Sequence, residues 1–352
     1  MPHKMKLGTR PTGRAKKNSS DSIICMNLNA QSLVHKRDEL ILNTQQYKPL
    51  IIGVTESWGH EEMEDGSFKL DGYVMYRSDR IGRRGGGTIL YVASKLGQRE
   101  CVAIRRSTRG IPFENSSWCW VTPTRGKKIL VGCIYRSTSS TVANDAKLND
   151  LIRQANEVAG GNRLLLMGDF NVPYIDWINV TTLPGARIIE KDFLETISDN
   201  FLCQHVKEPT RFRGTEKSVL DLFFTKEEGD VKNIKVLPPI ALSDHGIVMG
   251  EFICKWKNRI VPKKTPVYAK GSYDIIAREI EDINWMGMAQ DLTAKELLRE
   301  YNHNYKVLTN NNIPLGSPKD YNEPWMDRDI MRVWKKKTHA WNRLGEWNSG
   351  GR

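Results

Sequence analysis

Polar side chains follow three apolar runs of the sequence, at the point where each run ends. In α/β folds such strand ends build sites, because the rigid sheet fixes the side chains while the loops leave room for a substrate. Mg²⁺ prefers one or two carboxylates with amide or water oxygens, and a substrate phosphate can complete its coordination. Each residue alone is a weak signal, but the recurrence predicts a site for a metal ion and a phosphate. These residues are Asn29, Glu56, Asp169 and Asn171.

A histidine and two aspartates form a second candidate group. Asp244 and His245 directly precede an expected strand over residues 247–253, where they can respectively bind a metal and contact a phosphate oxygen. Asp221 interrupts an apolar strand over residues 219–225 and needs a partner if it is buried. An imidazole is the natural candidate, because the carboxylate would fix its tautomer and favour its charged form. An isolated histidine is more often a hydrogen-bonded structural residue, so both interpretations stay open.

The elements that must position these residues alternate between strands and helices up to about residue 255. This mixture predicts a layered α/β domain. Strands are expected over residues 22–28, 50–55, 73–77, 88–93, 118–122, 129–135, 163–167, 219–225 and 247–253. Helices are expected over residues 37–47, 144–159 and 188–200.

Beyond residue 256 the pattern changes to helical spacing, after Pro262 and Pro266 interrupt the chain. Trp334 and Trp341 share an apolar stripe beside three lysines, and packing against a core is favoured there over stacking on bases. We expect a basic disordered arm over residues 1–20, an α/β domain over 21–255 and a basic, mainly helical extension over 256–352.

The net charge of +12 is concentrated at the two ends of the chain. Residues 1–20 hold six Lys or Arg and no acid, the central 21–255 hold 30 against 29, and residues 256–352 hold 17 against 12. Basic ends suggest auxiliary contact with a polyanion, since neutralising phosphates supplies most non-specific nucleic-acid affinity. A solvated arm that only keeps the protein soluble is an equally good interpretation of residues 1–20.

Composition excludes several other classes of protein. The 352 residues are 39% hydrophobic and 27% charged, as in globular proteins. The six cysteines contain no C-x-x-C pair, which argues against a zinc ribbon or a disulfide scaffold. No apolar run reaches the roughly 18 residues of a membrane span, and residues 1–20 contain no stretch typical of a secretion signal. We expect a nuclear or cytoplasmic protein that is neither secreted nor held in a membrane.

Short motifs occur together in the order typical of the endonuclease/exonuclease/phosphatase superfamily. The ordered set, over about residues 22–255, resembles the apurinic-type endonuclease domain of non-LTR (LINE-type) retrotransposons. The resemblance implies a four-layer α/β sandwich, in which two mixed β-sheets lie face to face, flanked by helices, with a C-terminal helical extension. The motifs are Asn29-Ala30-Gln31-Ser32-Leu33, Thr55-Glu56-Ser57-Trp58, Gly85-Gly86-Gly87, Tyr135-Arg136, Gly168-Asp169-Phe170-Asn171-Val172-Pro173 with Asp176-Trp177, Leu220-Asp221-Leu222 and Ser243-Asp244-His245.

The same resemblance implies a role for each site residue. Glu56 would be the principal ligand of Mg²⁺, with Mn²⁺ as an alternative, and Asn29 and Asp244 would lie nearby. Asp169 would orient or deprotonate the attacking water, and Asn171 would hold the scissile phosphate. His245, paired with Asp221, would donate to a non-bridging oxygen. Tyr135 would lie near the phosphate or the leaving group.

Three features depart from the family pattern. Gln31 stands where DNA-repair relatives carry an acid, and Ser137-Thr138 replaces the usual prolines after Tyr135-Arg136. Glu323-Pro324-Trp325 and the basic stretch after it resemble the linker that precedes a reverse transcriptase, but no such domain follows in this sequence. We therefore expect an endonuclease module without the polymerase, either a truncated element copy or a retained host protein.

Arginines close to the motifs are candidates for contact with the backbone of double-stranded DNA, the expected partner. The alternative is ordinary solubilising charge in exposed loops. The candidates are Arg77, Arg80, Arg83, Arg84, Arg105, Arg106, Arg136 and Arg211.

The predicted function is a magnesium-dependent phosphodiesterase that nicks target DNA. The resemblance implies that the nick leaves a 3′-hydroxyl able to prime synthesis, as in target-primed reverse transcription. Two alternatives stay open: a catalytically silent, transposon-derived nucleic-acid-binding protein, and a phosphoesterase of the same superfamily with a non-DNA substrate. No membrane and no small-molecule cofactor are expected.

Overall fold

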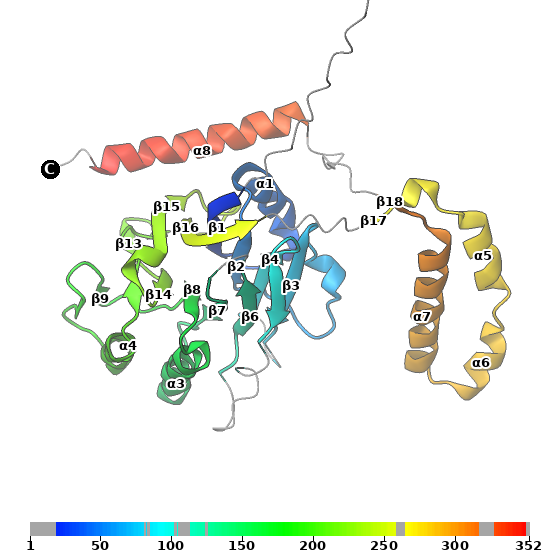
Figure 1. The fold of residues 1–352 in the computed structure, drawn as a ribbon, viewed down its shortest axis with the longest axis horizontal. Coiled ribbons are helices and arrows are strands. Elements are labelled where there is room, and N and C mark those ends of the chain that lie inside the picture. Colours follow the sequence, from blue (N-terminus) through cyan, green and yellow to red (C-terminus); the bar gives the residue numbers. More distant parts are fainter. Residues whose placement is uncertain are drawn as a thin grey trace, which may run out of the picture. The chain divides into compact units, whose positions relative to one another are not determined.

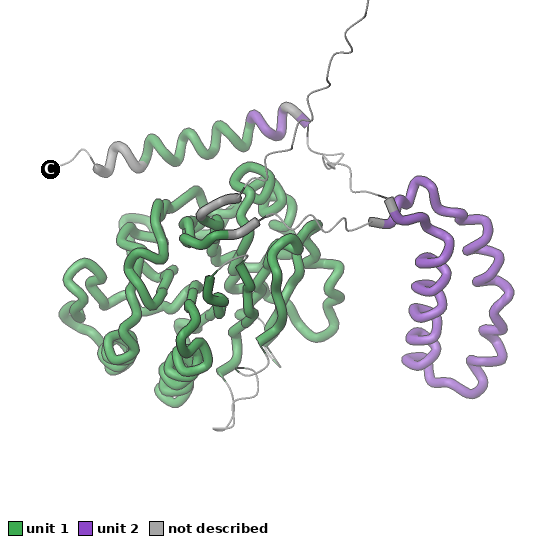
Figure 2. The backbone as a smooth tube through the Cα atoms, viewed as in Figure 1, with its two compact units in different colours: residues 1–259, 333–352 green, residues 260–332 purple. Residues whose placement is uncertain are grey.

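The chain divides into two compact units. The computed structural model describes residues 19–80, 82, 85–101, 104, 113–123, 126–257, 265–316 and 327–349 (Figure 1). One unit comprises residues 1–259 and 333–352, and the other residues 260–332 (Figure 2). Most of the predicted arm over residues 1–20 lies outside the described residues, but Ser19 and Ser20 begin the first strand.

The first sheet of the larger unit has six strands in the order β15-β16-β1-β2-β4-β3. Strands β1 and β2 are parallel and the other neighbours are antiparallel, so the sheet is mixed. Its strands are β1 (Ser19–Asn29), β2 (Ile51–Thr55), β3 (Tyr73–Ser78), β4 (Thr88–Ala93), β15 (Val231–Leu237) and β16 (Ile247–Lys257).

The second sheet repeats this plan with six strands in the order β11-β14-β8-β7-β6-β5. Strands β7 and β8 are its parallel pair. Its strands are β5 (Gly97–Glu100), β6 (Ser116–Thr122), β7 (Ile129–Tyr135), β8 (Arg163–Asp169), β11 (Cys203–Gln204) and β14 (Asp221–Thr225).

Strand β8 shows why the apolar runs of this sequence are continuous. Its side chains alternate: Leu164 and Leu166 pack with the helices on one face, and Leu165 and Met167 pack between the two sheets. Because successive side chains of a strand point to opposite faces, a strand buried on both sides must be apolar at every position. The unbroken run before Asp169 therefore encodes a central strand of a sandwich.

Helices cover the outer faces of the two sheets. Helix α1 (Arg37–Tyr47) packs through Leu40 on the first sheet, and α3 (Val142–Ala159) and α4 (Ile188–Asp199) pack on the second (Figure 1). Three apolar cores result, one between the sheets and one under each helical layer. The predicted four-layer α/β sandwich is confirmed.

Short elements complete the larger unit, and several connect parts of the site. They are the hairpins β9 (Ile175–Asp176) with β10 (Thr181–Thr182) and β12 (Arg211–Arg213) with β13 (Glu216–Ser218), and the 3-10 turns Val34–Lys36, Asp65–Ser67 and Glu228–Asp230.

The remaining elements lie past residue 257. The smaller unit holds β17 (Thr265–Pro266), a 3-10 turn (Tyr268–Lys270), α5 (Tyr273–Glu281), α6 (Trp285–Asp291), α7 (Ala294–Asn312) and β18 (Leu315–Gly316). Helix α8 (Arg328–Ser349) begins in that unit and belongs from Val333 onward to the larger one. No helix among the described residues is long and apolar enough to cross a membrane.

Candidate active site

The two sheets deliver their polar residues to the same end of the sandwich. Asn29 ends β1 and Glu56 follows β2, which runs parallel to β1 with Asn29 opposite Thr55. Asp169 ends β8, where it is opposite Asp221 of the antiparallel strand β14. This register is what brings side chains distant in the sequence together.

Asn29 links the two sheets through a single amide group. Its Nδ2 donates to Glu56 Oε1 at 3.0 Å and to Asp169 Oδ2 at 2.8 Å. Asn29 and Asp169 are fully buried. A buried amide donating to two carboxylates from different sheets fixes their separation, so these three predicted site residues form one constellation.

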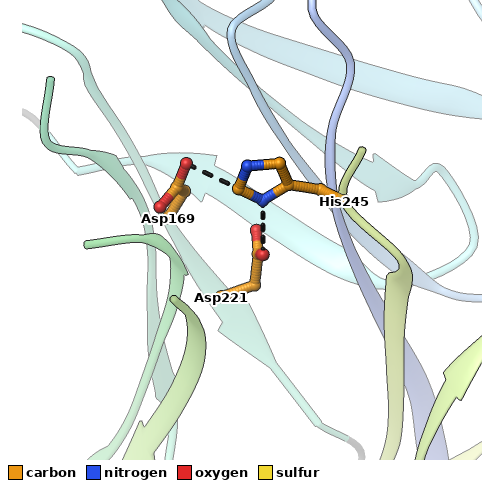
Figure 3. Close-up of side chains that lie close together, drawn as sticks. All are labelled: Asp169, Asp221 and His245. Atoms are coloured by element: carbon orange, nitrogen blue, oxygen red, sulfur yellow. Dashed lines mark hydrogen bonds and ion pairs between the residues drawn. The ribbon is translucent and has the colours of Figure 1, made fainter. Parts of the chain in front are cut away.

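His245 forms the pair with Asp221 that the sequence indicates. His245 Nδ1 lies 2.8 Å from Asp221 Oδ2 and 4.0 Å from Asp169 Oδ2 (Figure 3). Because a carboxylate only accepts, Nδ1 carries the proton of this bond. The backbone N–H of His245 donates to Ser243 Oγ at 3.2 Å, and that hydroxyl donates to the Asn29 carbonyl at 2.9 Å. The histidine is therefore held by the same strand end as Asn29.

The surrounding carboxylates keep His245 charged. Burial alone would lower its pKa, but Asp221, Asp169 and Asp244 outweigh burial and raise the pKa to about 9. Burial also raises the pKa of Asp169; Asp221 and Glu56 add to this rise, while His245 and Asn29 oppose it. The site thus holds the imidazolium of His245 beside the Asp169 carboxyl group, whose pKa is raised.

Asp244 lies at the more exposed edge of the site. It accepts from Gln31 Nε2 at 2.7 Å and from Arg211 Nε at 2.9 Å. Burial would raise the pKa of Asp244, but Arg211, His245 and Gln31 more than offset this and lower it. The glutamine that replaces an acid here therefore acts as a donor that orients Asp244.

Asn171 is fixed by a buried arginine. Its Nδ2 donates to the Arg136 carbonyl at 2.7 Å, and its backbone N–H donates to Asp169 Oδ1 at 3.2 Å. The Arg136 guanidinium donates to both carboxylate oxygens of Asp145, at 2.7 and 2.9 Å, and to the Asn171 carbonyl at 2.9 Å. Arg136 is only 1% exposed. The expected DNA contact of Arg136 therefore gives way to a structural role, because its guanidinium is enclosed and fully paired.

Glu56 and Tyr135 face each other beside Asp169. Glu56 Oε2 accepts from Trp58 Nε1 at 3.2 Å. Burial raises the pKa of Tyr135, and the neighbouring Glu56 and Asp169 raise it further, so its hydroxyl stays protonated. Glu56, with φ of 50°, and Trp58, with φ of 56°, adopt the left-handed region that such residues rarely occupy. Backbone strain of this kind concentrates at functional sites.

The other candidate arginines fall into two groups. Arg77 is committed to the protein: it pairs with Asp65 and Asp79, donates to the carbonyls of His60 and Met63, and lies over the Phe68 ring. Arg211 bonds Asp244, and Arg80 is partly buried. Arg83, Arg84, Arg105 and Arg106 lie outside the described residues. Contact of Arg80, Arg211 and these four with DNA stays a prediction.

The donor set suits a hard divalent cation. Four carboxylates converge, and among the described residues His245 and Arg211 are the cationic side chains that bond to them. Burial is the main cause of the raised pKa of Asp169, with smaller contributions from Asp221 and Glu56, and a nearby cation would favour its ionised form. All the uncommitted donors are oxygens, which Mg²⁺ and Mn²⁺ prefer over softer metals. The four carboxylates are Glu56, Asp169, Asp221 and Asp244.

A second placement of a cation is geometrically open but chemically poorer. Asp169, Asp221 and His245 each offer a ligand atom, and these atoms lie within 4.8 Å of one another. However, a ligating imidazole must be neutral, whereas the Asp221 and Asp169 carboxylates hold the proton on His245. The oxygen donors beside Glu56 therefore stay the candidate cation site.

Comparisons with known proteins agree with this fold and motif set. The family model "Endonuclease-reverse transcriptase" matches residues 129–249, which include β7, β8 and the Asp244-His245 segment. No protein of curated function matches the sequence significantly.

Several solved structures share the fold of this chain. The endonuclease domain of TRAS1, a telomere-specific non-LTR retrotransposon, is 16% identical with a TM-score of 0.51, covering 66% of this chain and 98% of its own. The AP endonuclease LMAP from Leishmania major is 14% identical with a TM-score of 0.54, covering 66% and 88%. The catalytic domain of Xenopus laevis APE2 is 11% identical with a TM-score of 0.50, covering 66% and 92%. The resemblance noted in the sequence is thus confirmed, and at 11–16% identity these structures show that the fold is shared.

The site contains residues to which sequence reasoning assigned no role. Gln31 and Ser243 orient Asp244 and His245, and Asp145 neutralises Arg136. Thr210 Oγ1 accepts from the backbone N–H groups of Leu220 and Asp221, which fixes the start of β14. Polar residues of this kind carry no periodic signal, because their roles depend on which strand ends become neighbours.

Proposed function

We propose that this protein is a metal-dependent phosphodiesterase that acts as a DNA endonuclease, with Mg²⁺ as its ion and Mn²⁺ as a substitute. The observation that carries the proposal is the position of Asp169, bonded to Asn29 from one sheet and facing the Asp221–His245 pair from the other side. A carboxylate between a candidate cation site and an imidazolium is an arrangement suited to phosphodiester hydrolysis.

Glu56 would hold the metal ion, with Asn29 and Asp244 beside it. When bound, the ion supplies neutralisation of the charge that develops on the phosphate oxygens. Asp169 would orient the attacking water and accept its proton, because its carboxylate lies between Asn29 and the Asp221–His245 pair. Asn171 lies next to Asp169 to steady the scissile phosphate.

His245 and Tyr135 act as donors on the same phosphate. The Nδ1–H of His245 donates to Asp221, so the Nε2–H remains to donate to a non-bridging oxygen. The protonated Tyr135 hydroxyl, next to Glu56 and Asp169, can donate to the phosphate or to the leaving oxygen. Together these residues offer positive charge where the transition state becomes more negative.

DNA as the substrate, and a nick that leaves a 3′-hydroxyl, are supported by the likeness to retrotransposon and apurinic endonucleases. The family model, which covers endonuclease-reverse transcriptases, supports a role in initiating reverse transcription at the nick. We propose a nuclear or cytoplasmic location, with residues 1–20 as an auxiliary basic arm for DNA.

Supercoiled plasmid tests the proposal directly. The purified full chain should nick it when MgCl₂ is present and stop when EDTA is added, and a DNA polymerase should extend the nicked ends. Asp169→Asn should slow nicking by about 10²–10³. Asp192→Asn, an exposed aspartate on α4, is the matched control and should act as wild type.

Two outcomes would favour the other interpretations. Equal, background-level nicking by wild type and Asp169→Asn, with DNA binding retained, would indicate a silent nucleic-acid-binding protein. Metal-dependent cleavage of a small phosphodiester without any nicking of plasmid would indicate a phosphoesterase with a non-DNA substrate.

A further inference from the structure

Helix α8 packs on the larger unit although 70 residues separate the end of β16 from its first residue. Trp334 is 8% exposed and packs against Tyr47 of α1, with ring centroids 5.9 Å apart. Trp341 meets Phe212 of β12 edge-on at 5.1 Å, and its Nε1 donates to the Val236 carbonyl at 3.3 Å. From Val333 onward the helix belongs to the same compact unit as the sheets (Figure 2).

Lys337 contacts the segment that leads into the site. Its Nζ pairs with Glu39 Oε1 of α1 and donates to the Pro239 carbonyl at 2.7 Å. The other oxygen of Glu39 accepts from the backbone N–H of Ala241 at 2.8 Å. Ala241 has a φ of 46°, in the left-handed region, so this turn needs external support. Lys337 and Glu39 together hold residues 239–241 from two sides.

Only two residues lie between that held turn and Asp244. Ser243 donates its backbone N–H to the Ile240 carbonyl at 3.0 Å, and its hydroxyl in turn accepts from the His245 N–H. Contacts that hold residues 239–241 in place therefore also restrain the Asp244-His245 segment through these hydrogen bonds.

The Trp341 contact reaches the same segment by a second route. Phe212, on which Trp341 packs, donates its N–H to the Asp244 carbonyl at 2.8 Å. Its neighbour Arg211 bonds the Asp244 carboxylate, and Thr210 accepts from the Gly246 N–H at 2.7 Å. Strand β12 is three residues long, so packing on Phe212 fixes most of it.

We infer that α8 is a brace for the catalytic segment: Lys337 and Trp341 are positioning residues that hold residues 239–246 and β12 in place, and through them Asp244 and His245. As far as it concerns catalysis, this inference rests on the proposed nuclease function. In this inference residues 333–344 contribute to catalysis by positioning the site and do not serve only as a linker.

Hydrogen exchange of the full-length protein tests the brace without reference to activity. In Lys337→Met and in Trp341→Ala, the amides of Ala241, Ser243, His245 and Gly246 should exchange at least about tenfold faster, because their support is lost. Lys335→Met, which removes an exposed lysine two residues away on the same helix, is the matched control and should leave these rates unchanged. Unchanged exchange in both brace variants would overturn the inference.

Kinetics then separates positioning from mere stability. The brace variants should lower kcat by about tenfold at saturating plasmid with little change in KM, and Lys337→Arg should restore most of the rate. If Lys337→Met unfolds, Glu39→Gln replaces it, since glutamine keeps an acceptor for the Ala241 N–H but loses the ion pair.

The two proposals fail in different ways. A wild-type protein that never nicks DNA contradicts the nuclease, while the exchange data still decide the brace. A wild type that nicks normally, with faster exchange but unaltered kcat in the brace variants, contradicts the positioning role and leaves the nuclease intact.

Discussion

His245 Nδ1 and Asp221 Oδ2 are 2.8 Å apart in the buried floor of the site, although 24 positions separate the two residues in the sequence. The pair exists because Asp221 begins β14 in the second sheet and His245 directly precedes β16 in the first. It is therefore a contact between sheets, and the Asp221 carboxylate helps to raise the pKa of His245.

Loss of Asp221 should act through His245. Asp221→Asn keeps the shape but removes the charge that holds the imidazole protonated, so turnover on plasmid should fall. Because both residues serve one function, Asp221→Asn combined with His245→Ala should be no worse than His245→Ala alone. Additive losses in single-turnover nicking rates would mean that the two residues act independently.

The charged imidazole should also appear in the pH dependence of folding. Its pKa of about 9 in the folded protein exceeds the usual 6.5, so its stabilising contribution is complete below pH 6.5 and disappears as the pH rises through 9. The full effect is on the order of 3 kcal/mol. The raised pKa of Asp169, which reflects burial first, makes stability fall with rising pH as well. Urea unfolding in EDTA between pH 6 and 10 measures this, and in Asp221→Asn the slope should flatten.

Removing one partner of the buried Arg136–Asp145 pair should lower the free energy of unfolding strongly, whereas replacing both partners by apolar residues should lower it much less. Arg136→Met leaves Asp145 without its partner and should destabilise the protein by about 3–5 kcal/mol. Adding Asp145→Leu should recover much of this loss in urea unfolding, because no uncompensated charge remains. Lys69→Met breaks an ion pair whose side chains are 72% and 86% exposed and serves as the control, with a change below about 1 kcal/mol. An equally small effect of Arg136→Met would contradict the proposed support of Asn171.

Gly168 should tolerate no side chain. Its φ is 151°, and a Cβ there would lie 1.8 Å from the Ile134 carbonyl oxygen of the neighbouring strand. Since backbone cannot yield like a flexible side chain, Gly168→Ala should cost more than about 3 kcal/mol and should misplace Asp169. Gly161→Ala, where a Cβ meets nothing within 4 Å, should change thermal stability by less than about 0.5 kcal/mol. A stable, fully active Gly168→Ala would show that β7 and β8 can separate without loss.

The fold was largely predictable because its central strands are apolar and its helices amphipathic. The expected bounds of β4, β7 and α1 agree with the structure to the residue. The strand over residues 231–237 was not predicted. It lies at a sheet edge, and its two lysines are exposed, so the sequence shows no continuous apolar run there. The two-residue and three-residue hairpin strands were also missed, because so few residues show no periodicity.

The site was predictable as a set of residues and less so as a set of roles. The Asp221–His245 pair could be inferred from a charge inside an apolar run, and it is present. Arg136 was expected on the surface because an arginine in a loop usually is exposed. Its burial depends on Asp145, at the start of α3, and no local pattern indicates that the two meet. The contacts of α8 were beyond sequence reasoning for the same reason, although packing of Trp334 and Trp341 was expected and is confirmed.

The amide of Asn29 bonds Glu56 of the first sheet and Asp169 of the second. The geometry of the site therefore depends on how the two sheets are aligned. A slip of one sheet over the other by a fraction of an ångström would change little in the apolar contacts between the sheets, because such contacts are not directional. The same slip would separate Glu56 from Asp169. Mutations in the inter-sheet core, for example at Cys133 or Met167, should therefore affect turnover out of proportion to their effect on stability. Selection for cleavage would in that case restrain residues that never approach the substrate.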